Sequence, residues 1–263
     1  MTLHFVSGLP RSGSTLLCNI LAQNPRFHAT ATSGILEMLF QVRNGWDKVT
    51  EFRAMDDQRS MAAKQRVLAG MLTGYFADVD RPVVFDKSRG WLGHLEMAEM
   101  LLGYKPKVLV PVRDLRDVLA SFERLYRQTS ALAQTPDEAT NYAAYQKIEN
   151  RLDMWAGVGG PVGMAYNRIK DAQARGWGPQ MQFVRYEMLT AKPAETMAAI
   201  YQFLGEELFQ HDFENVAQVT TEDDRVYGFA HLHTIRPQVQ AQPPSWPSIL
   251  GSHADKYKNQ EIW

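Results

Sequence analysis

Short apolar runs alternate with amphipathic stretches along the chain as far as Leu204. Five runs are apolar and β-prone: 3–7, 27–32, 82–85, 107–112 and 181–185. Between them, apolar residues recur at helical spacing and predict helices over 15–24, 34–43, 58–76, 92–102, 115–126, 137–152, 164–175 and 193–204. Strands that alternate with helices are typical of βαβ units. The pattern therefore predicts a three-layer α/β fold, in which helices cover both faces of a parallel sheet of about five strands.

After Asp212 the pattern becomes irregular, and prolines occur at positions 237, 243, 244 and 247. Apolar and aromatic residues nevertheless continue to the end of the chain: Phe229, Leu232, Ile235, Trp246, Ile249, Leu250 and Trp263. This content favours packing against the rest of the protein over disorder. We interpret the segment as a loop-rich C-terminal flap on a single domain that spans 1–263.

Composition excludes several classes of function. The 263 residues carry a formal net charge of -1, which argues against a nucleic-acid or membrane-surface partner. A single cysteine, Cys18, rules out an intramolecular disulfide and a cysteine-rich zinc site. No apolar run is long enough to span a membrane, and the N-terminus lacks a secretory pattern, so we expect a cytoplasmic protein. Nothing in the sequence indicates an oligomeric state.

A candidate phosphate loop joins the first predicted strand to the first predicted helix. Residues 8–15 read Gly-Leu-Pro-Arg-Ser-Gly-Ser-Thr, and backbone N–H groups at such a helix start converge on a bound anion. Gly8 and Gly13 allow the loop to bend around the anion, and Arg11 adds a fixed positive charge. The spacing matches that of a P-loop, but Ser14 stands where an NTPase has lysine. The clamp on β- and γ-phosphates is therefore missing.

Residues 10–17, Pro-Arg-Ser-Gly-Ser-Thr-Leu-Leu, resemble the 5′-phosphosulfate loop of the sulfotransferases that use 3′-phosphoadenosine 5′-phosphosulfate (PAPS). The arginine form of the motif is most similar to the protein-tyrosine and bacterial branches of that family. The resemblance implies a P-loop type fold with PAPS as the sulfuryl donor. It also implies that the donor is bound by residues of this loop, namely Arg11, Ser12, Gly13, Ser14, Thr15 and Leu16.

A second candidate anion site follows the strand predicted at 107–112. Arg113 stands at the carboxyl end of that strand, where the ligands of open α/β sheets bind, and Ser121 lies about two turns along the next helix. The spacing of Arg113 and Ser121 resembles the 3′-phosphate site of the sulfotransferases. Two anion sites on adjacent strand ends suit a nucleotide with phosphates at both ends of its ribose.

Two further stretches resemble the same family. Residues 185–189, Arg-Tyr-Glu-Met-Leu, resemble an element whose tyrosine lies near the nucleotide, here Tyr186. Residues 233–237, His-Thr-Ile-Arg-Pro, resemble a late loop whose basic residue, here Arg236, covers the 3′-phosphate. The resemblance covers about 1–126 and 180–237, while 127–179 reads as a helical insertion where acceptor contacts would differ.

Sulfuryl transfer requires positive charge at the leaving oxygen and a base for the acceptor hydroxyl. Lys87, in Phe-Asp-Lys-Ser after a short apolar strand, resembles the family lysine that faces the transferring group, with Arg11 on its other side. Glu37 is our candidate for the base, because family members carry a glutamate near the second strand. Asp86 and His94 are the reserve candidates. The cationic side chains supply the charge, so no metal is required.

The sequence thus predicts an enzyme that transfers a sulfuryl group from PAPS to a hydroxyl or amine acceptor and releases adenosine 3′,5′-bisphosphate. Two alternatives stay open. A P-loop kinase or NTPase would need Mg²⁺, and a lysine where Ser14 stands. A non-catalytic nucleotide-binding protein of the same fold would keep the pocket without turnover. The acceptor itself is not specified by the sequence.

Overall fold

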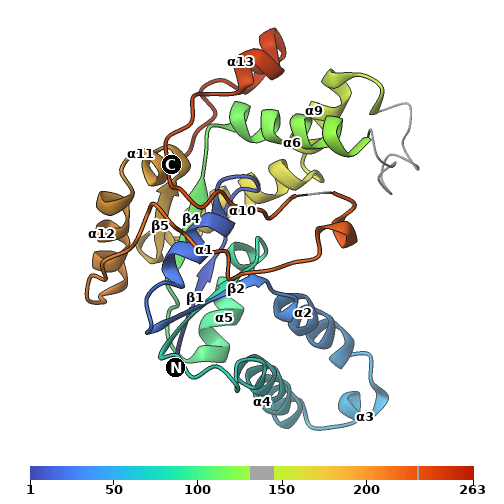
Figure 1. Cartoon of the computed structure of the whole chain (residues 1–263). Coiled ribbons are helices and arrows are strands. Elements are labelled where there is room, and N and C mark those ends of the chain that lie inside the picture. Colours follow the sequence, from blue (N-terminus) through green and yellow to red (C-terminus); the bar gives the residue numbers. More distant parts are fainter. Residues whose placement is uncertain (131–144, 230) are drawn as a thin grey trace.

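A five-stranded parallel sheet forms the centre of the molecule in the computed structural model, which describes residues 1–130, 145–229 and 231–263 (Figure 1). The strands are β1 (Thr2–Val6), β2 (Phe27–Thr32), β3 (Val83–Lys87), β4 (Val108–Val112) and β5 (Met181–Arg185). Their order across the sheet is β2-β3-β1-β4-β5. The chain thus builds outward from β1 in both directions, so that β1 lies between β3 and β4 at a topological switch point. Ligands of open α/β sheets bind at the carboxyl ends of the strands at such a point.

Alternating side chains of the strands pack into two separate cores. In β4, Val108, Val110 and Val112 face one core, whereas Leu109 faces the other. Both faces of the sheet are therefore buried beneath helices, which explains why the strands read as continuous apolar runs. Aromatic stacking strengthens one face, where the rings of Phe5 and Trp91 lie 3.9 Å apart.

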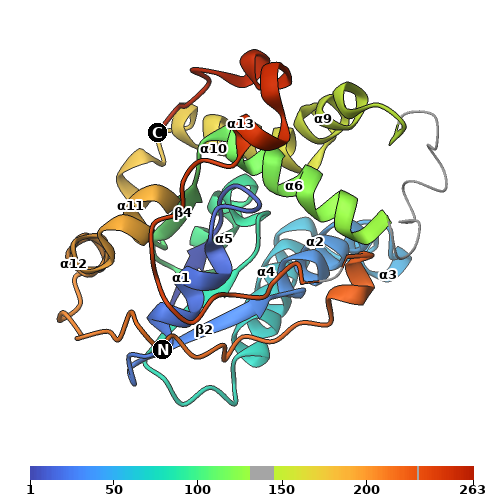
Figure 2. The ribbon, with the colours of Figure 1, turned by 45° about the horizontal axis from the view of Figure 1, so that its top comes forward.

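Helices surround the sheet on both faces (Figure 2). The helices before β4 are α1 (Ser14–Leu21), α2 (Ile35–Trp46), α3 (Thr50–Arg53), α4 (Asp57–Tyr75), η1 (Trp91–Gly93) and α5 (Leu95–Leu102). Those between β4 and the flap are α6 (Leu115–Ser130), α9 (Ile148–Ala156), α10 (Pro161–Ala174), η2 (Gly178–Gln180), α11 (Tyr186–Ala191) and α12 (Pro193–Leu204). Among the described residues, every helix is too short or too polar to cross a membrane.

The predicted fold class is confirmed, since the sheet is parallel, has five strands and carries helices on both faces. The predicted strand 82–85 runs on to Lys87, so that Lys87 ends the strand rather than following it. Part of the predicted helix 137–152 lies outside the described residues, and α9 begins at Ile148. The short helix α11 was not predicted, because its six residues are too few to show helical periodicity.

The C-terminal flap is loop-rich, as predicted, with η3 (Asp224–Tyr227), α13 (Trp246–Ile249) and η4 (Gly251–Tyr257) as its helical turns. It is anchored to α1, where the Asn19 side chain donates a hydrogen bond to the Thr220 hydroxyl (2.8 Å) and accepts one from the Thr220 N–H (3.0 Å). In Figure 2 this orange-to-red segment runs across the front of α1. The anchor holds the flap over the carboxyl ends of the strands.

Candidate active site

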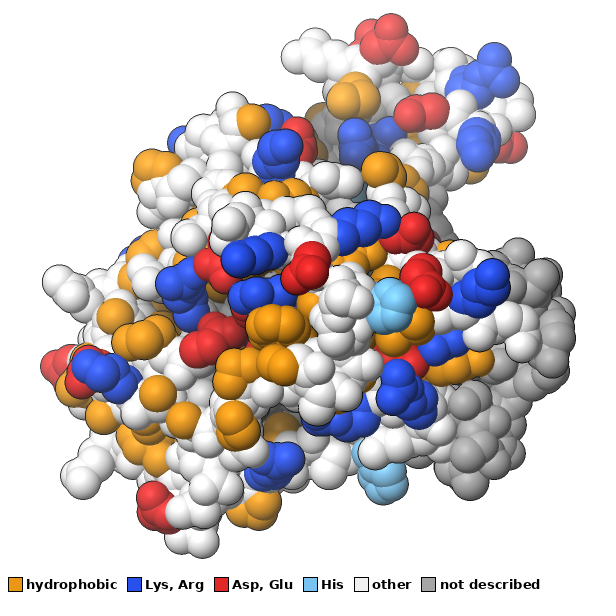
Figure 3. All heavy atoms as spheres, turned by 90° about the horizontal axis from the view of Figure 1, so that it is seen from above, with side chains coloured by type: hydrophobic (Ala, Val, Ile, Leu, Met, Phe, Trp, Pro, Cys, Tyr) orange, Lys and Arg blue, Asp and Glu red, His pale blue; other side chains and the backbone are white. Residues whose placement is uncertain are grey.

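A cavity of about 1380 Å³ opens at the carboxyl ends of the strands. It is lined by the loop between β1 and α1, the ends of β3 and β4, part of α6 and α9, and the flap. Among its described lining residues, six are Lys or Arg and one, Asp153, is acidic: Arg11, Lys87, Arg89, Arg113, Arg124 and Arg236 are the basic ones. Seen from above, Lys and Arg side chains lie across the middle of the molecule, interspersed with Asp and Glu (Figure 3). A protein of net charge -1 thus concentrates positive charge where a ligand would bind.

The candidate phosphate loop is held by close backbone contacts. A Cβ at Gly8 would lie 2.2 Å from the carbonyl oxygen of Pro111, so only glycine permits this approach of the loop to β4. Gly13 has a φ of 83°, and a Cβ there would lie 2.6 Å from Cδ2 of Tyr186. Arg11 has a φ of 56°, which is strained for a residue with a side chain. The loop is thus fixed in a shape that its sequence does not favour locally, as is common at binding sites.

Arg11 connects the loop both to α6 and to the flap. Its Nε donates a hydrogen bond to the Ser121 hydroxyl (3.0 Å), and its Nη1 donates one to the Leu232 carbonyl. Burial and the nearby charge of Arg113 lower the pKa of the Arg11 guanidinium. An anion placed between the two arginines would relieve that repulsion.

The side chain of Arg113 is positioned at the end of β4 with spare hydrogen-bonding capacity. Its guanidinium lies 4.4 Å from the ring centre of Tyr186, and its Nη1 donates to the Arg11 carbonyl (3.3 Å). Its Nε is buried, with no hydrogen-bond partner among the described residues. A buried donor that lacks a partner costs free energy, about 1 to 3 kcal/mol. The donor therefore fits an anionic ligand that supplies the missing acceptor.

The remaining predicted donor-site residues divide into two groups. Ser14, Thr15, Leu16 and Arg236 line the cavity, with Arg236 exposed on the flap. Ser12 does not line it: its hydroxyl is directed at the carbonyls of Leu9 (2.5 Å) and Pro111 (3.0 Å) and holds the loop to β4. The side chain of Ser12 therefore shapes the loop. Only the backbone of Ser12 would contact a ligand directly.

Lys87 forms a buried ion pair with Glu222 of the flap. The Nζ of Lys87 lies 2.9 Å from Oε1 of Glu222, and both side chains are 7% exposed. Glu222 also accepts hydrogen bonds from the backbone N–H (2.8 Å) and hydroxyl (2.9 Å) of Thr32. Although burial opposes it, these bonds and the charge of Lys87 lower the pKa of Glu222 to about 2. Glu222 is therefore ionised throughout the physiological range.

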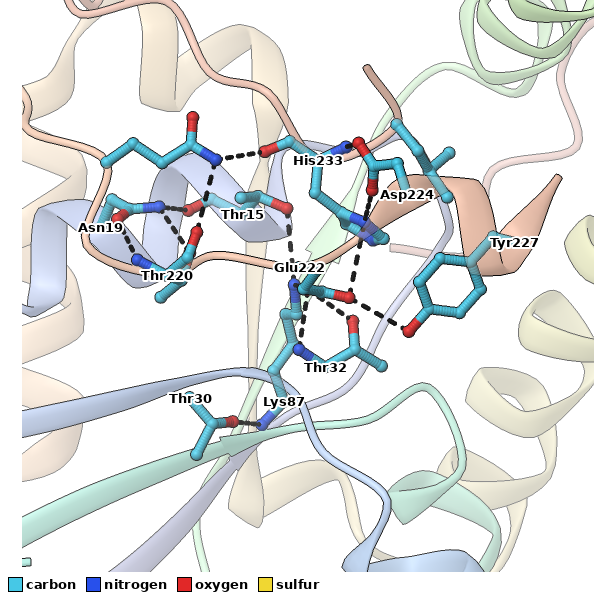
Figure 4. A network of polar contacts seen from close by, with 12 residues as sticks. Thr15, Asn19, Thr30, Thr32, Lys87, Thr220, Glu222, Asp224, Tyr227 and His233 are labelled. Atoms are coloured by element: carbon cyan, nitrogen blue, oxygen red, sulfur yellow. Dashed lines mark hydrogen bonds and ion pairs between the residues drawn. The ribbon is translucent and has the colours of Figure 1, made fainter. Parts of the chain in front are cut away.

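Next to this pair, the flap carries a histidine oriented by an aspartate (Figure 4). The Nδ1 of His233 lies 2.6 Å from Oδ1 of Asp224, and the His233 backbone N–H donates to Oδ2 of Asp224 (3.0 Å). The ring of Tyr227 packs edge-on against the imidazole at 5.5 Å. With Nδ1–H donating to the carboxylate, Nε2 is left as the proton acceptor of the ring. His233 lines the cavity and can act there as a base.

The family of the chain is established by a match to a protein-family model. The model of a family described as the sulfotransferase family matches residues 4–211. The chain belongs to the sulfotransferase family. The resemblance stated from the sequence is thereby confirmed. No curated protein sequence matches the chain at a significant level.

Solved sulfotransferase structures share the fold at low sequence identity. The sulfotransferase domain from the curacin biosynthetic pathway is 17% identical, with a TM-score of 0.54, over 99% of this chain and 92% of that one. The sulfotransferase domain of the Synechococcus PCC 7002 olefin synthase is also 17% identical, with a TM-score of 0.50, over 100% and 89%. A sulfotransferase from Alicyclobacillus acidocaldarius is 14% identical, with a TM-score of 0.50, over 86% and 88%. At these identities the similarity establishes the fold alone.

The candidate bases named from the sequence lie elsewhere in this sulfotransferase. Glu37 is exposed on α2, accepts a hydrogen bond from Gln41 (3.0 Å), and does not line the cavity. Asp86 is fully buried and accepts a hydrogen bond from the Trp91 indole (2.6 Å), and burial raises its pKa. His94 packs against Phe40, also outside the cavity lining. The reserve candidate next to Lys87 in sequence, Asp86, is thus directed into the protein rather than into the cavity.

Glu222 and Asp224 were not singled out from the sequence, and His233 was not proposed there as a base. Their one signal was an acidic run at 222–224 within the irregular flap, which is common in solvated loops. Within the described ranges, no group of three or more His, Cys, Asp or Glu side chains is arranged to hold a metal ion.

Proposed function

We propose that the protein transfers a sulfuryl group from PAPS to a hydroxyl acceptor and releases adenosine 3′,5′-bisphosphate. The observation that carries the proposal is the unpartnered, buried Nε of Arg113, whose Nη1 donates a hydrogen bond to the Arg11 carbonyl of the candidate phosphate loop. Cations at the ends of the adjacent strands β1 and β4 support two anion sites, and the second would have no use in binding ATP.

The donor site would be shared between these strands. The N-terminus of α1, with Ser14, Thr15 and Arg11, would hold the 5′-phosphosulfate, because backbone N–H groups and a cation converge there. Arg113, Ser121 and Arg236 would hold the 3′-phosphate, with Tyr186 packed against Arg113. When bound, PAPS supplies a sulfuryl group whose bond to the phosphate oxygen breaks as a new bond forms to the acceptor oxygen.

Residues of this chain would act on both ends of that exchange. The ammonium of Lys87, 3.5 Å from the Thr15 hydroxyl, stabilises negative charge on the leaving phosphate oxygen. His233 accepts the proton of the acceptor hydroxyl at Nε2, while Asp224 fixes the ring and stabilises the imidazolium. Positioning and electrostatic stabilisation are then sufficient, as in phosphoryl transfer.

Ligand-dependent thermal stability tests the donor. Adenosine 3′,5′-bisphosphate should raise the melting temperature, because it binds only the folded protein. ATP with Mg²⁺ is the matched control, since it lacks a 3′-phosphate. Stabilisation by ATP–Mg²⁺ alone would refute the proposal and favour a kinase or NTPase. Binding of the bisphosphate without transfer of labelled sulfate to any hydroxyl acceptor in a broad panel would favour a non-catalytic binding protein.

A further inference from the structure

Two cations of the cavity, Arg89 and Arg124, have no role in the proposed donor site, and Arg89 is the one that lies near Lys87. It follows Lys87 by two residues, so their Cα atoms lie within about 7 Å, and its side chain lines the same cavity. It lies beyond the end of β3, on the opposite side of β1 from β4 and its Arg113. Arg89 therefore lies on the β3 side of the cavity, which the proposed 3′-phosphate site at Arg113 leaves to the acceptor.

The guanidinium of Arg89 is positively charged and without an anion. Its main-chain carbonyl accepts a hydrogen bond from Arg168 (3.3 Å), but no described residue forms an ion pair or hydrogen bond with the Arg89 side chain. Burial and the charge of Arg168 lower the pKa of Arg89. The residue is exposed, and it lines the cavity.

Two carboxylates at the cavity are already engaged, one on the lining residue Asp153 and one on Glu222, the partner of Lys87. Glu222 is bound by Lys87, Thr32 and Tyr227, and Asp153 accepts hydrogen bonds from Lys256 and Tyr257. Arg89 is thus a cation on the cavity wall with no carboxylate partner among the described residues, and it makes a site for an anion from outside the chain.

Apolar side chains complete this part of the cavity. Val226, Tyr227 and Phe229 of the flap line it together with Arg89. A ligand there would meet a guanidinium at one end, an apolar wall along its length, and Lys87 and His233 at the transfer centre. Such a combination of one charged group with an apolar lining fixes the orientation of a small molecule.

We propose that the acceptor carries a carboxylate or phosphate in addition to its reactive hydroxyl, and that Arg89 binds this anionic group. The inference rests on the proposed function, since it concerns the acceptor of the same reaction. A planar guanidinium binds either anion through two parallel N–H donors, so it orients the acceptor as well as attracting it. Hydroxy acids and hydroxyl-bearing phosphomonoesters are thus the predicted substrate class.

Calorimetric titration of the protein saturated with adenosine 3′,5′-bisphosphate tests this site, because the donor phosphates then occupy their own cations. The probes are two matched pairs: 4-hydroxybenzoate with 4-hydroxybenzamide, and 4-hydroxyphenyl phosphate with hydroquinone. At least one anionic probe should bind about tenfold or more tightly than its neutral partner, as expected for a charge-assisted hydrogen bond. Arg89→Gln should remove that preference while leaving bisphosphate affinity unchanged.

Arg66→Gln is the matched control, because Arg66 is exposed on α4 and does not line the cavity. The control should retain the full preference. Equal affinity for acid and neutral probes, no binding of any probe, or a preference that persists in Arg89→Gln would overturn the inference and leave the donor assignment standing. Failure of the bisphosphate itself to bind would refute the proposed function instead, so the two failures are distinguishable.

Discussion

The two sides of the cavity are built differently. On the β4 side, Arg113 and Arg11 repel one another, and Arg113 keeps a buried donor without a partner. On the β3 side, Lys87 is neutralised by Glu222 from the flap, 135 residues away in sequence. Under the proposed function, the donor side is therefore preformed for an anion, whereas the charge that would act on the transferring group is already paired with a carboxylate. Binding and transfer would then depend on different parts of the chain.

Under the proposed function, this difference gives the flap a part in the reaction. Glu222, Asp224 and His233 all belong to it, and the Leu232 carbonyl accepts a hydrogen bond from Arg11. A sulfuryl group at Lys87 has to compete with Glu222, so donor binding must weaken that ion pair. Variants on the two sides should consequently separate binding from turnover.

The largest effect is expected from Lys87→Ala. Loss of the only cation placed against the Thr15 hydroxyl among the described residues should lower the transfer rate about 10²- to 10³-fold, as for other preorganised donors in active sites. Affinity for adenosine 3′,5′-bisphosphate should fall by much less than the transfer rate, because Arg11 and the N-terminus of α1 would also hold its 5′-phosphate. Transfer rates measured with labelled PAPS check the first expectation, and calorimetric affinities for the bisphosphate check the second. A loss of affinity equal to the loss of rate would contradict the assignment.

His233→Gln should reduce turnover by about 10²-fold, because a glutamine cannot accept the acceptor proton. Asp224→Asn should reduce it less, since the imidazole would remain but lose the partner that fixes its tautomer. Single-turnover rates measure both, with bisphosphate affinity as the control. Unchanged turnover in His233→Gln would exclude this residue as the base.

Glu222→Gln tests the charge balance on the β3 side. It leaves Lys87 without its counter-ion, and with screening by solvent in the cavity this should lower the free energy of unfolding by about 2 kcal/mol. Chemical denaturation without ligand measures the loss. A variant as stable as the wild type at neutral pH would show that the ion pair contributes nothing.

The same pair predicts an acid dependence of stability. The pKa of Glu222 is about 2 in the folded protein, below its ordinary value near 4.5. The ion pair therefore stabilises the fold fully above about pH 4.5, and this contribution is lost as the pH falls toward 2. The difference in stability between the wild type and Glu222→Gln should shrink over that window. A difference that stays constant down to pH 2 would contradict the shift.

Arg113→Lys tests the donor side with its charge preserved. A lysine cannot supply the Nε donor or stack as a planar group on Tyr186, so bisphosphate affinity should fall about tenfold. Turnover at saturating PAPS should change little. Calorimetry measures the bisphosphate affinity, and saturation kinetics measure the rate at saturating PAPS. A fall in that rate with unchanged affinity would place Arg113 at the transfer centre instead.

The sheet and the basic edge of the cavity were predictable from the sequence because both depend on local patterns. Apolar runs mark the strands, and the basic residues that end or follow them mark the binding edge, as with Arg11, Lys87 and Arg113. The contacts of the flap on the β3 side were not predictable in this way. The contacts of Glu222 and His233 arise from tertiary folding of an irregular flap, which carries no periodicity. Likewise, the inward direction of the Ser12 hydroxyl depends on the close approach of the loop to β4.

The smallest effect is expected from Glu37→Gln, and it decides between two candidate bases. Glu37 is exposed on α2 and contacts Gln41, so its loss should change turnover by less than about twofold, in contrast to His233→Gln. Parallel single-turnover measurements of the two variants give the comparison directly. If Glu37→Gln were the slower of the two, α2 would have to move toward β3 during the reaction, and the base would come from the sheet side of the cavity rather than from the flap.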